Sequence, residues 1–234
     1  MSDQESPDPE TALAAGIALY ADGEYHAAHD PWEAVWLDLD AETAPEDERL
    51  FHGLVQVTAA VYHARDGNFE GATGLAESAS DYLEPLSPNH RGVESTGIRE
   101  FCDRLVTDPE LIERAEPPEI RLHGRPVSYL DLSIPAMTLA AEAIAEEYGY
   151  DESVVTSAGA FAETDAEDAV ETPALASGEA GSPAPNANDS RFATFLLDFL
   201  TQPENRGIIF QRLREHVERR RQANADVTGL FDVE

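Results

Sequence analysis

Hydrophobic residues recur at spacings of three and four along most of the chain, which is the spacing of one face of an α-helix. The pattern is clearest over residues 48–67, where Leu50, Leu54, Val57 and Val61 repeat at intervals of four, three and four. This run is too long and too regular for a β-strand, although its valines and threonine also favour strands. We therefore expect a long amphipathic helix here.

The same spacing recurs through the parts of the chain that we expect to fold, and almost all of their predicted elements are helices. One segment departs from it, because residues 119–132 alternate around His123 and Gly124, a pattern typical of a short β-hairpin. The fold class that we expect is all-α, a helical bundle with this hairpin as a small addition. The further predicted helices cover residues 11–20, 69–83, 94–106, 136–148, 192–200 and 207–224.

Composition divides the chain into four parts. Residues 1–9 are polar with two prolines, so we expect a disordered N-terminus. Residues 10–150 carry the periodic pattern and are predicted to form the helical bundle domain. Residues 151–190 are acidic and rich in small residues, glycine and proline, and we interpret them as a disordered acidic linker. Residues 191–234 are expected to form a C-terminal helical segment.

The charge of the chain is strongly negative, with 47 acidic residues, 15 basic residues and a formal net charge of −32. Every basic residue is an arginine, and the acidic residues are spread along the whole chain. This composition is typical of a halophilic protein, because a Debye length of roughly 3 Å at molar salt screens an acidic surface from itself. It disfavours a broad nucleic-acid surface, which needs clustered basic residues.

The N-terminal sequence, the length of the apolar runs and the cysteine count predict a soluble cytoplasmic protein. The N-terminus lacks the basic and apolar segments of a secretory signal, and no apolar run approaches the ~20 residues that span a membrane. The single cysteine, Cys102, excludes an intrachain disulfide and fits a reducing compartment. Because Cys102 follows Phe101 on a predicted amphipathic helix, we interpret it as a small buried residue and not as a nucleophile.

Histidines and acidic residues gather in the stretch EYHAAHDPWEAVW. On a helix His26, His29 and Glu33 lie along one edge, because residues three and four apart are neighbours. Pro31 leaves two interpretations open. Either one kinked helix runs through the stretch, or Asp30 caps a new helix in which Glu33 completes a capping box.

A second group of polar residues lines the long predicted helix, namely His52, Gln56 and His63. The short connection between the two helices favours an antiparallel hairpin, which would bring His29 and Glu33 opposite His52 and Gln56. Imidazole and carboxylate groups are ligands that zinc, iron and nickel accept. His29, Glu33 and His52 are therefore candidate metal ligands.

Three motifs follow one another through this region: G-E-Y-x-x-A-H-[DE]-x-W-E-x-x-W, then R-L-x-x-G-L-x-Q-x-x-A-A-x-Y-H, then G-N-x-x-G-A. The chain supplies them over residues 23–36, 49–63 and 67–72. In this order and spacing the sequence resembles the domain of unknown function 309 family, over roughly residues 11–85, about a third of the chain.

The resemblance implies a small all-helical bundle and one helix through residues 25–37, and it supplies no established activity, substrate or cofactor. The chain departs from the family pattern at two positions. Asp30 stands where members usually carry glutamate, and His52 where they usually carry glutamine, so that His52 is not an inherited ligand. By motif the resemblance carries over a polar site of four residues: His29, Glu33, Gln56 and His63.

Three functional hypotheses follow, of which we favour the first. It is a non-catalytic binding or interaction module in which His29 and Glu33 form a buried polar network, with a protein or a second copy of the chain as partner. The second is a metal-dependent enzyme, a hydrolase, that uses His29 and Glu33. The third is an RNA-associated protein that uses a basic helix, although such arginines also suit a helix C-terminus that pairs with the protein's own acids. Its candidate contact residues are Arg212, Arg219, Arg220 and Arg221.

Overall fold

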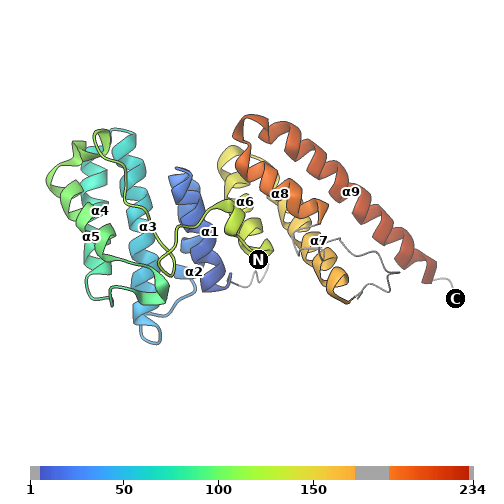
Figure 1. Ribbon diagram of the computed structural model, residues 1–234, viewed down its shortest axis with the longest axis horizontal. Coiled ribbons are helices and arrows are strands. Elements are labelled where there is room, and N and C mark those ends of the chain that lie inside the picture. The colour runs from blue at the N-terminus through green and yellow to red at the C-terminus, as the bar shows by residue number, and fades with distance from the viewer. Residues whose placement is uncertain (1–5, 172–189, 232–234) are drawn as a thin grey trace, which may run out of the picture. The chain divides into compact units, whose positions relative to one another are not determined.

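The computed structural model describes residues 6–171 and 190–231, and over these residues the chain is all-α, as predicted (Figure 1). It divides into two compact units, Met1–Ala143 and Ile144–Glu234. Short loops and 3₁₀ turns connect the helices. The helices are α1 (Pro9–Ala21), α2 (Tyr25–Trp36), α3 (Pro45–Arg65), α4 (Phe69–Leu83), α5 (Thr96–Thr107), α6 (Ile134–Tyr148), α7 (Glu152–Glu171), α8 (Arg191–Thr201) and α9 (Arg206–Phe231).

In the first unit, helices pack against their neighbours in chain order. α1 lies against α2, α2 against α3, α3 against α4, and α4 against α5 (Figure 1). The connections from α1 to α2, from α2 to α3 and from α3 to α4 are short, so these helices pack as antiparallel neighbours. The core between them contains large side chains that are fully buried: Leu13, Ile17, Leu19, Trp32, Leu50, Phe51, Leu54, Leu83, Ile98 and Leu105.

α3 is the long amphipathic helix that the hydrophobic spacing predicts. All four residues of the repeat, Leu50, Leu54, Val57 and Val61, are buried. The helix begins at Pro45, whose missing N–H costs nothing in the first turn. Three acidic residues in that turn favour the positive end of the helix.

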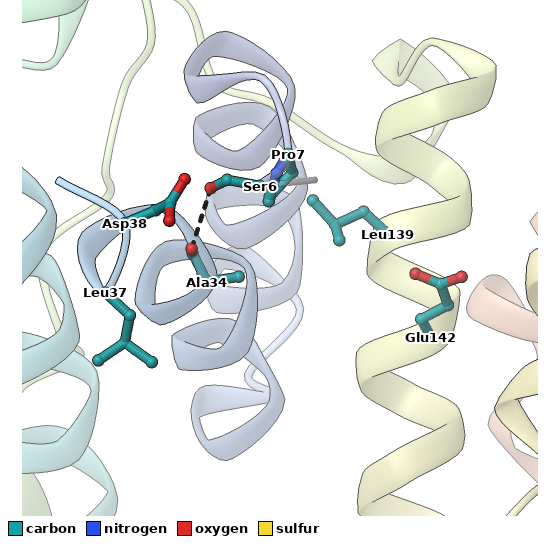
Figure 2. Close-up of a pocket in the computed structure, with 7 residues that line it drawn as sticks. All are labelled: Ser6, Pro7, Ala34, Leu37, Asp38, Leu139 and Glu142. Atoms are coloured by element: carbon teal, nitrogen blue, oxygen red, sulfur yellow. Dashed lines mark hydrogen bonds between the residues drawn. The ribbon is translucent and has the colours of Figure 1, made fainter. Parts of the chain in front are cut away.

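Side chains from the N-terminal segment close two helix ends in this unit. Asp8 accepts a hydrogen bond from the Thr11 N–H at 2.9 Å and so caps the start of α1. Ser6 donates to the Ala34 carbonyl at 3.1 Å, in the last turn of α2 (Figure 2). The carbonyls of a last turn lack an intrahelical partner, and Ser6 supplies one from 28 positions away.

The alternative left open by Pro31 is resolved by α2. The helix runs from Tyr25 to Trp36 with Pro31 inside it, and its N-cap residue is Glu24. The capping box of Asp30 and Glu33 therefore does not form. Pro31 is buried, so the apolar ring adds to the face that α2 packs against its neighbours.

In the second unit α7, α8 and α9 contact one another pairwise. The ring of Tyr150 packs edge-on against that of Phe199, with centroids 5.3 Å apart. Arg206, at the start of α9, is buried and donates from Nε to the Phe199 carbonyl at 3.2 Å. The apolar core of this unit contains Val155, Ala158, Ala162, Leu196, Phe199, Leu200, Leu213 and Val217.

The expectation that a linker begins at residue 151 is wrong for residues 152–171, which form α7. The buried face of α7 is built from Val154, Val155, Ala158 and Ala162. Such small side chains give little hydrophobic signal in an acidic, alanine-rich sequence. The expectation of a disordered N-terminus is wrong for residues 6–9, because Ser6 and Asp8 form hydrogen bonds and Pro9 begins α1. The remainder of the predicted linker, residues 172–189, and residues 1–5 of the predicted N-terminus lie outside the described residues.

The hairpin expected over residues 119–132 is present only as its turn. Leu122 and Arg125 exchange backbone hydrogen bonds of 2.9 and 3.0 Å. Between them His123 and Gly124 have φ of 51° and 75°, the positive values that a tight hairpin turn requires. Pro126 follows at once and cannot donate to a ladder, which explains why no strand continues within the described residues.

Candidate functional site

Two ring contacts fix the register of α2 against α3. The ring centroid of Trp36 lies 4.1 Å from that of His52, and the centroid of His26 lies 5.2 Å from that of Tyr62. The helices are therefore antiparallel, as expected. However, His52 lies level with Trp36, which follows His29 by seven residues, or about 10 Å along the helix. The expectation that His29 faces His52 is wrong by about two helical turns.

The three candidate metal ligands are consequently not brought together. His29 and Glu33 lie one turn apart on α2, and His52 lies beyond their reach on α3. Gln56, half-buried on α3, lies near the level of Glu33 by the same register. Over residues 6–171 and 190–231, no group of three or more histidine, cysteine, aspartate or glutamate side chains is placed to hold a metal ion.

His29 instead contacts two carboxylates of its own helix. Its Nδ1 lies 2.6 Å from Asp30 Oδ1, and its Nε2 lies 3.6 Å from Glu33 Oε2. The hydrogen bond to Asp30 raises the pKa of His29, and this effect outweighs that of partial burial. The side chains of His29 and Glu33 are 28% and 39% exposed, so the pair lies at the surface and not in the buried network that we expected.

Four rings form a continuous row across the edge between α2 and α3, which we name the ring strip: His29, His26, Tyr62 and His63. Successive ring centroids lie 5.7, 5.2 and 5.8 Å apart. Tyr62 is 42% exposed, and His26 is exposed as well. The ring strip thus joins His29 and His63 of the motifs through His26, which the helical spacing places beside His29, and through Tyr62, which was not among the candidate site residues.

The far end of the ring strip is held by Asn68, the N-cap residue of α4. Asn68 Oδ1 accepts from the Gly71 N–H at 3.1 Å, and Asn68 Nδ2 lies 3.1 Å from His63 Nδ1. Because the amide nitrogen can only donate, His63 Nδ1 accepts this bond. The neutral His63 ring therefore carries its hydrogen on Nε2.

A separate pocket of about 450 Å³ lies beside the C-terminal end of α2. Figure 2 shows that the N-terminal segment, α2 and α6 all contribute to it. Leu37 and Leu139 give it apolar walls, and Asp38 and Glu142 give it two carboxylates. None of the residues singled out from the sequence lines this pocket, so it is distinct from the ring strip.

Comparison with known proteins covers the part of the chain that contains the ring strip. Residues 13–75 match the model of a family described as a domain of unknown function, DUF309. We name these matched residues the DUF309 domain. No curated protein matches the chain. Over the described residues, none of the helices has the length and apolar character to cross a membrane.

Packing between α2, α3 and α4 explains where His52 lies. The imidazole is stacked between the rings of Trp36 and Tyr82, with centroid distances of 4.1 and 3.8 Å and interplanar angles of 31° for both contacts. Glu48 Oε1 accepts from Trp36 Nε1 at 3.1 Å and lies 3.2 Å from His52 Nδ1. Tyr82, beyond the matched residues, completes the stack, and His52 therefore serves the packing of three helices.

The C-terminal arginines lie outside the DUF309 domain, and two of the four contact α7. Arg220 pairs with Asp165 of α7 at 3.1 Å, and Arg221 donates to the Ser157 hydroxyl on the same helix. Arg212 and Arg219 are exposed. The four arginines, which the RNA hypothesis treats as one patch, are thus divided between two faces of α9, and the pair of Arg220 with Asp165 agrees with the alternative that such arginines pair with the protein's own acids.

Proposed function

We propose that the DUF309 domain is a non-catalytic binding module, and that its ring strip contacts a protein partner. The observation that carries this proposal is Tyr62, an aromatic side chain that is 42% exposed and has an imidazole in ring contact on either side. Tyrosine is enriched at interfaces, because its ring offers a large contact area at a small cost in side-chain entropy. The neighbouring imidazoles offer hydrogen-bond donors and acceptors.

The arrangement of the titratable groups supports binding over catalysis. An acid–base or nucleophilic site needs several groups directed at one reacting atom. Here His29 is engaged by two carboxylates of its own helix, His63 by Asn68, and His52 by Glu48 and two rings. These partners differ and lie at different levels of α2 and α3, so the three histidines do not converge on one point as the hypothesis of a metal-dependent hydrolase requires.

The charge around the ring strip favours a protein partner over a nucleic acid. Asp30 and Glu33 flank the His29 end, and the net charge of the chain is −32. A phosphate backbone would be repelled by both. At the other end of α2, Arg65 lies 4.9 Å from the ring centroid of Tyr25 and pairs with Glu116, so this cation is also engaged within the protein.

Site-specific photocrosslinking tests the proposal. A photoreactive phenylalanine analogue replaces Tyr62 in the full chain, in the cells that make the protein, and replaces Tyr148 in a matched control. Both tyrosines are exposed, at 42% and 52%. We expect one discrete protein adduct from position 62 and none of that mass from position 148.

A second variant shows whether the adduct depends on the ring strip. His26→Ala removes the ring that contacts Tyr62 from α2, at an exposed position where folding should be retained. We expect the adduct at position 62 to be lost or strongly reduced, while the helical circular dichroism is unchanged. Identical adducts from positions 62 and 148, or an adduct that is insensitive to His26→Ala, would contradict the proposal.

A further inference from the structure

In the second unit, α8 and α9 bring an imidazole and two guanidinium groups together. His216 Nε2 lies 3.3 Å from Arg191 Nη1 and 3.3 Å from Arg219 Nη2, and His216 Nδ1 lies 2.8 Å from the same atom of Arg219. The ring of Phe195 packs edge-on against His216, with centroids 4.9 Å apart. Because α8 and α9 contact each other, this group sits where the two helices meet (Figure 1).

The hydrogen bonds of His216 define how the two cations meet it. Its Nδ1 lies 2.9 Å from the Arg212 carbonyl, which can only accept, and 2.8 Å from Arg219 Nη2, which can only donate. Its Nε2 is approached at 3.3 Å by the guanidinium groups of both Arg191 and Arg219. Two like charges therefore converge on a single weak acceptor.

This arrangement is unexpected in a chain with 47 acidic and 15 basic residues. Glu215 precedes Arg219 by four residues, the favourable order for an ion pair on a helix. Yet Arg219 Nε donates to the backbone carbonyl of Glu215 at 3.1 Å, while the Glu215 carboxylate accepts from Gln211 at 3.3 Å. Among the described residues, neither Arg191 nor Arg219 forms an ion pair with a carboxylate, whereas Arg220 does.

The carboxylate of Asp165, on α7, is engaged by other groups. Asp165 accepts from the Ser190 hydroxyl at 2.8 Å and from Arg220 at 3.1 Å. Ser190 precedes Arg191 and caps the start of α8. Asp165 therefore holds the helix start and Arg220, and leaves the positive charge of Arg191 and Arg219 uncompensated.

We propose that Arg191, Arg219 and His216 form a binding site for the phosphate group of a small anionic ligand. Guanidinium groups present planar forks of N–H donors that match phosphate oxygens. A phosphate between the two guanidinium groups would accept charge-assisted hydrogen bonds from both, in place of their contacts with the imidazole of His216. It would also relieve the repulsion between the two exposed guanidinium groups.

The extent of the site favours a small ligand over a nucleic acid. A phosphate backbone needs a row of cations that follows it. Arg220 and Arg221 would extend such a row, but both contact α7 instead. Arg191 and Arg219, the two guanidinium groups that contact His216, match one phosphate group, and the net charge of −32 would oppose a longer polyanion.

Isothermal titration calorimetry on the full chain tests the site, with inorganic phosphate and phenyl phosphate as probes at one fixed ionic strength. We expect one saturable site, with affinity reduced about tenfold or more in Arg191→Gln and in Arg219→Gln, because each removes a charge-assisted donor pair. Arg214→Gln is the matched control. It removes the same charge from the exposed surface of α9, two residues from His216 and hence on another side of the helix.

The outcomes separate the sources of the phosphate group. Tighter binding of phenyl phosphate than of inorganic phosphate supports an organic phosphate ligand, and equal binding supports free phosphate. Absence of saturable binding, or an equal loss of affinity in Arg214→Gln, would overturn the proposal. Binding of a single-stranded uridine oligonucleotide that requires Arg191 and Arg219, without binding of either small probe, would overturn it in favour of a nucleic acid.

Discussion

Gly16 offers a sharp test of the packing of α1 against α2. A Cβ atom built at Gly16 would lie 2.3 Å from Trp32 Cε2, 2.4 Å from Nε1 and 2.9 Å from Cζ2. Trp32 is fully buried, and its rigid indole can move only by displacing other core side chains. Overpacking of this kind costs about 1–3 kcal/mol, and three atoms closer than contact distance place Gly16→Ala at the upper end.

The higher helix propensity of alanine offsets part of this overpacking cost. Alanine is favoured over glycine inside a helix by about 1 kcal/mol, so that we expect Gly16→Ala to destabilise the first unit by a net ~2 kcal/mol. Gly74 supplies the control. It is exposed inside α4, and a Cβ there meets no atom within 4 Å. Gly74→Ala should therefore stabilise by about 0.5–1 kcal/mol.

Urea unfolding followed by tryptophan fluorescence measures both effects. The two tryptophans, Trp32 and Trp36, lie in the first unit, so the signal reports on that unit alone. With a urea dependence of ~2 kcal/mol per molar, the midpoint should fall by about 1 M for Gly16→Ala and rise slightly for Gly74→Ala. A rise in both variants would show that the indole is not held against α1 as described.

Three further predictions concern titratable groups. Arg91 and His90 donate to Asp47 and lower its pKa below the usual 3.8. This contact should therefore stabilise the fold at pH values above 3.8, and its contribution should be lost as the pH falls through the folded-state pKa of Asp47. Asp47→Asn should lower the free energy of unfolding by about 1 kcal/mol at pH 7 and weaken the pH dependence of unfolding under acidic conditions. Asp30 raises the pKa of His29 above 6.5, so the contribution of this pair is complete below 6.5 and lost as the pH rises through the folded-state pKa; an NMR titration should show the pKa of His29 fall in Asp30→Asn. Burial raises the pKa of Cys102 to about 12, so iodoacetamide should label it slowly at pH 8 in the folded protein and rapidly in urea, as mass spectrometry can follow.

Much of the fold was predictable because its helices carry large apolar residues at regular spacing. α4 begins and ends at the predicted residues, since Asn68 caps it and the following prolines stop it. α7 was not found because its buried face is made of alanine and valine, and its exposed face of acids, a composition shared with disordered segments. A helix whose buried side chains are small is therefore hard to predict from sequence, even when those side chains recur at helical spacing.

The candidate site was less predictable, because it depends on the register of two helices. Spacing placed His29 and Glu33 on one edge of α2 correctly, as their contact of 3.6 Å shows. Whether His52 or Tyr62 meets them depends on how far α3 slides along α2. That position is set by the stack of Trp36, His52 and Tyr82, which involves a residue two helices away in sequence. No local pattern encodes such a contact.

The hydrogen bond from Ser6 to the last turn of α2 also indicates which fragments of the protein should be stable. The DUF309 match begins at residue 13 and ends at residue 75, so it excludes Ser6 and cuts both α1 and α4. It also excludes Leu83, whose fully buried side chain packs so close to Gly53 that a Cβ there would lie 2.7 Å from it. The limits of family similarity are thus not the limits of a stable fragment, and a shortened version for expression should retain Ser6 and extend through α5.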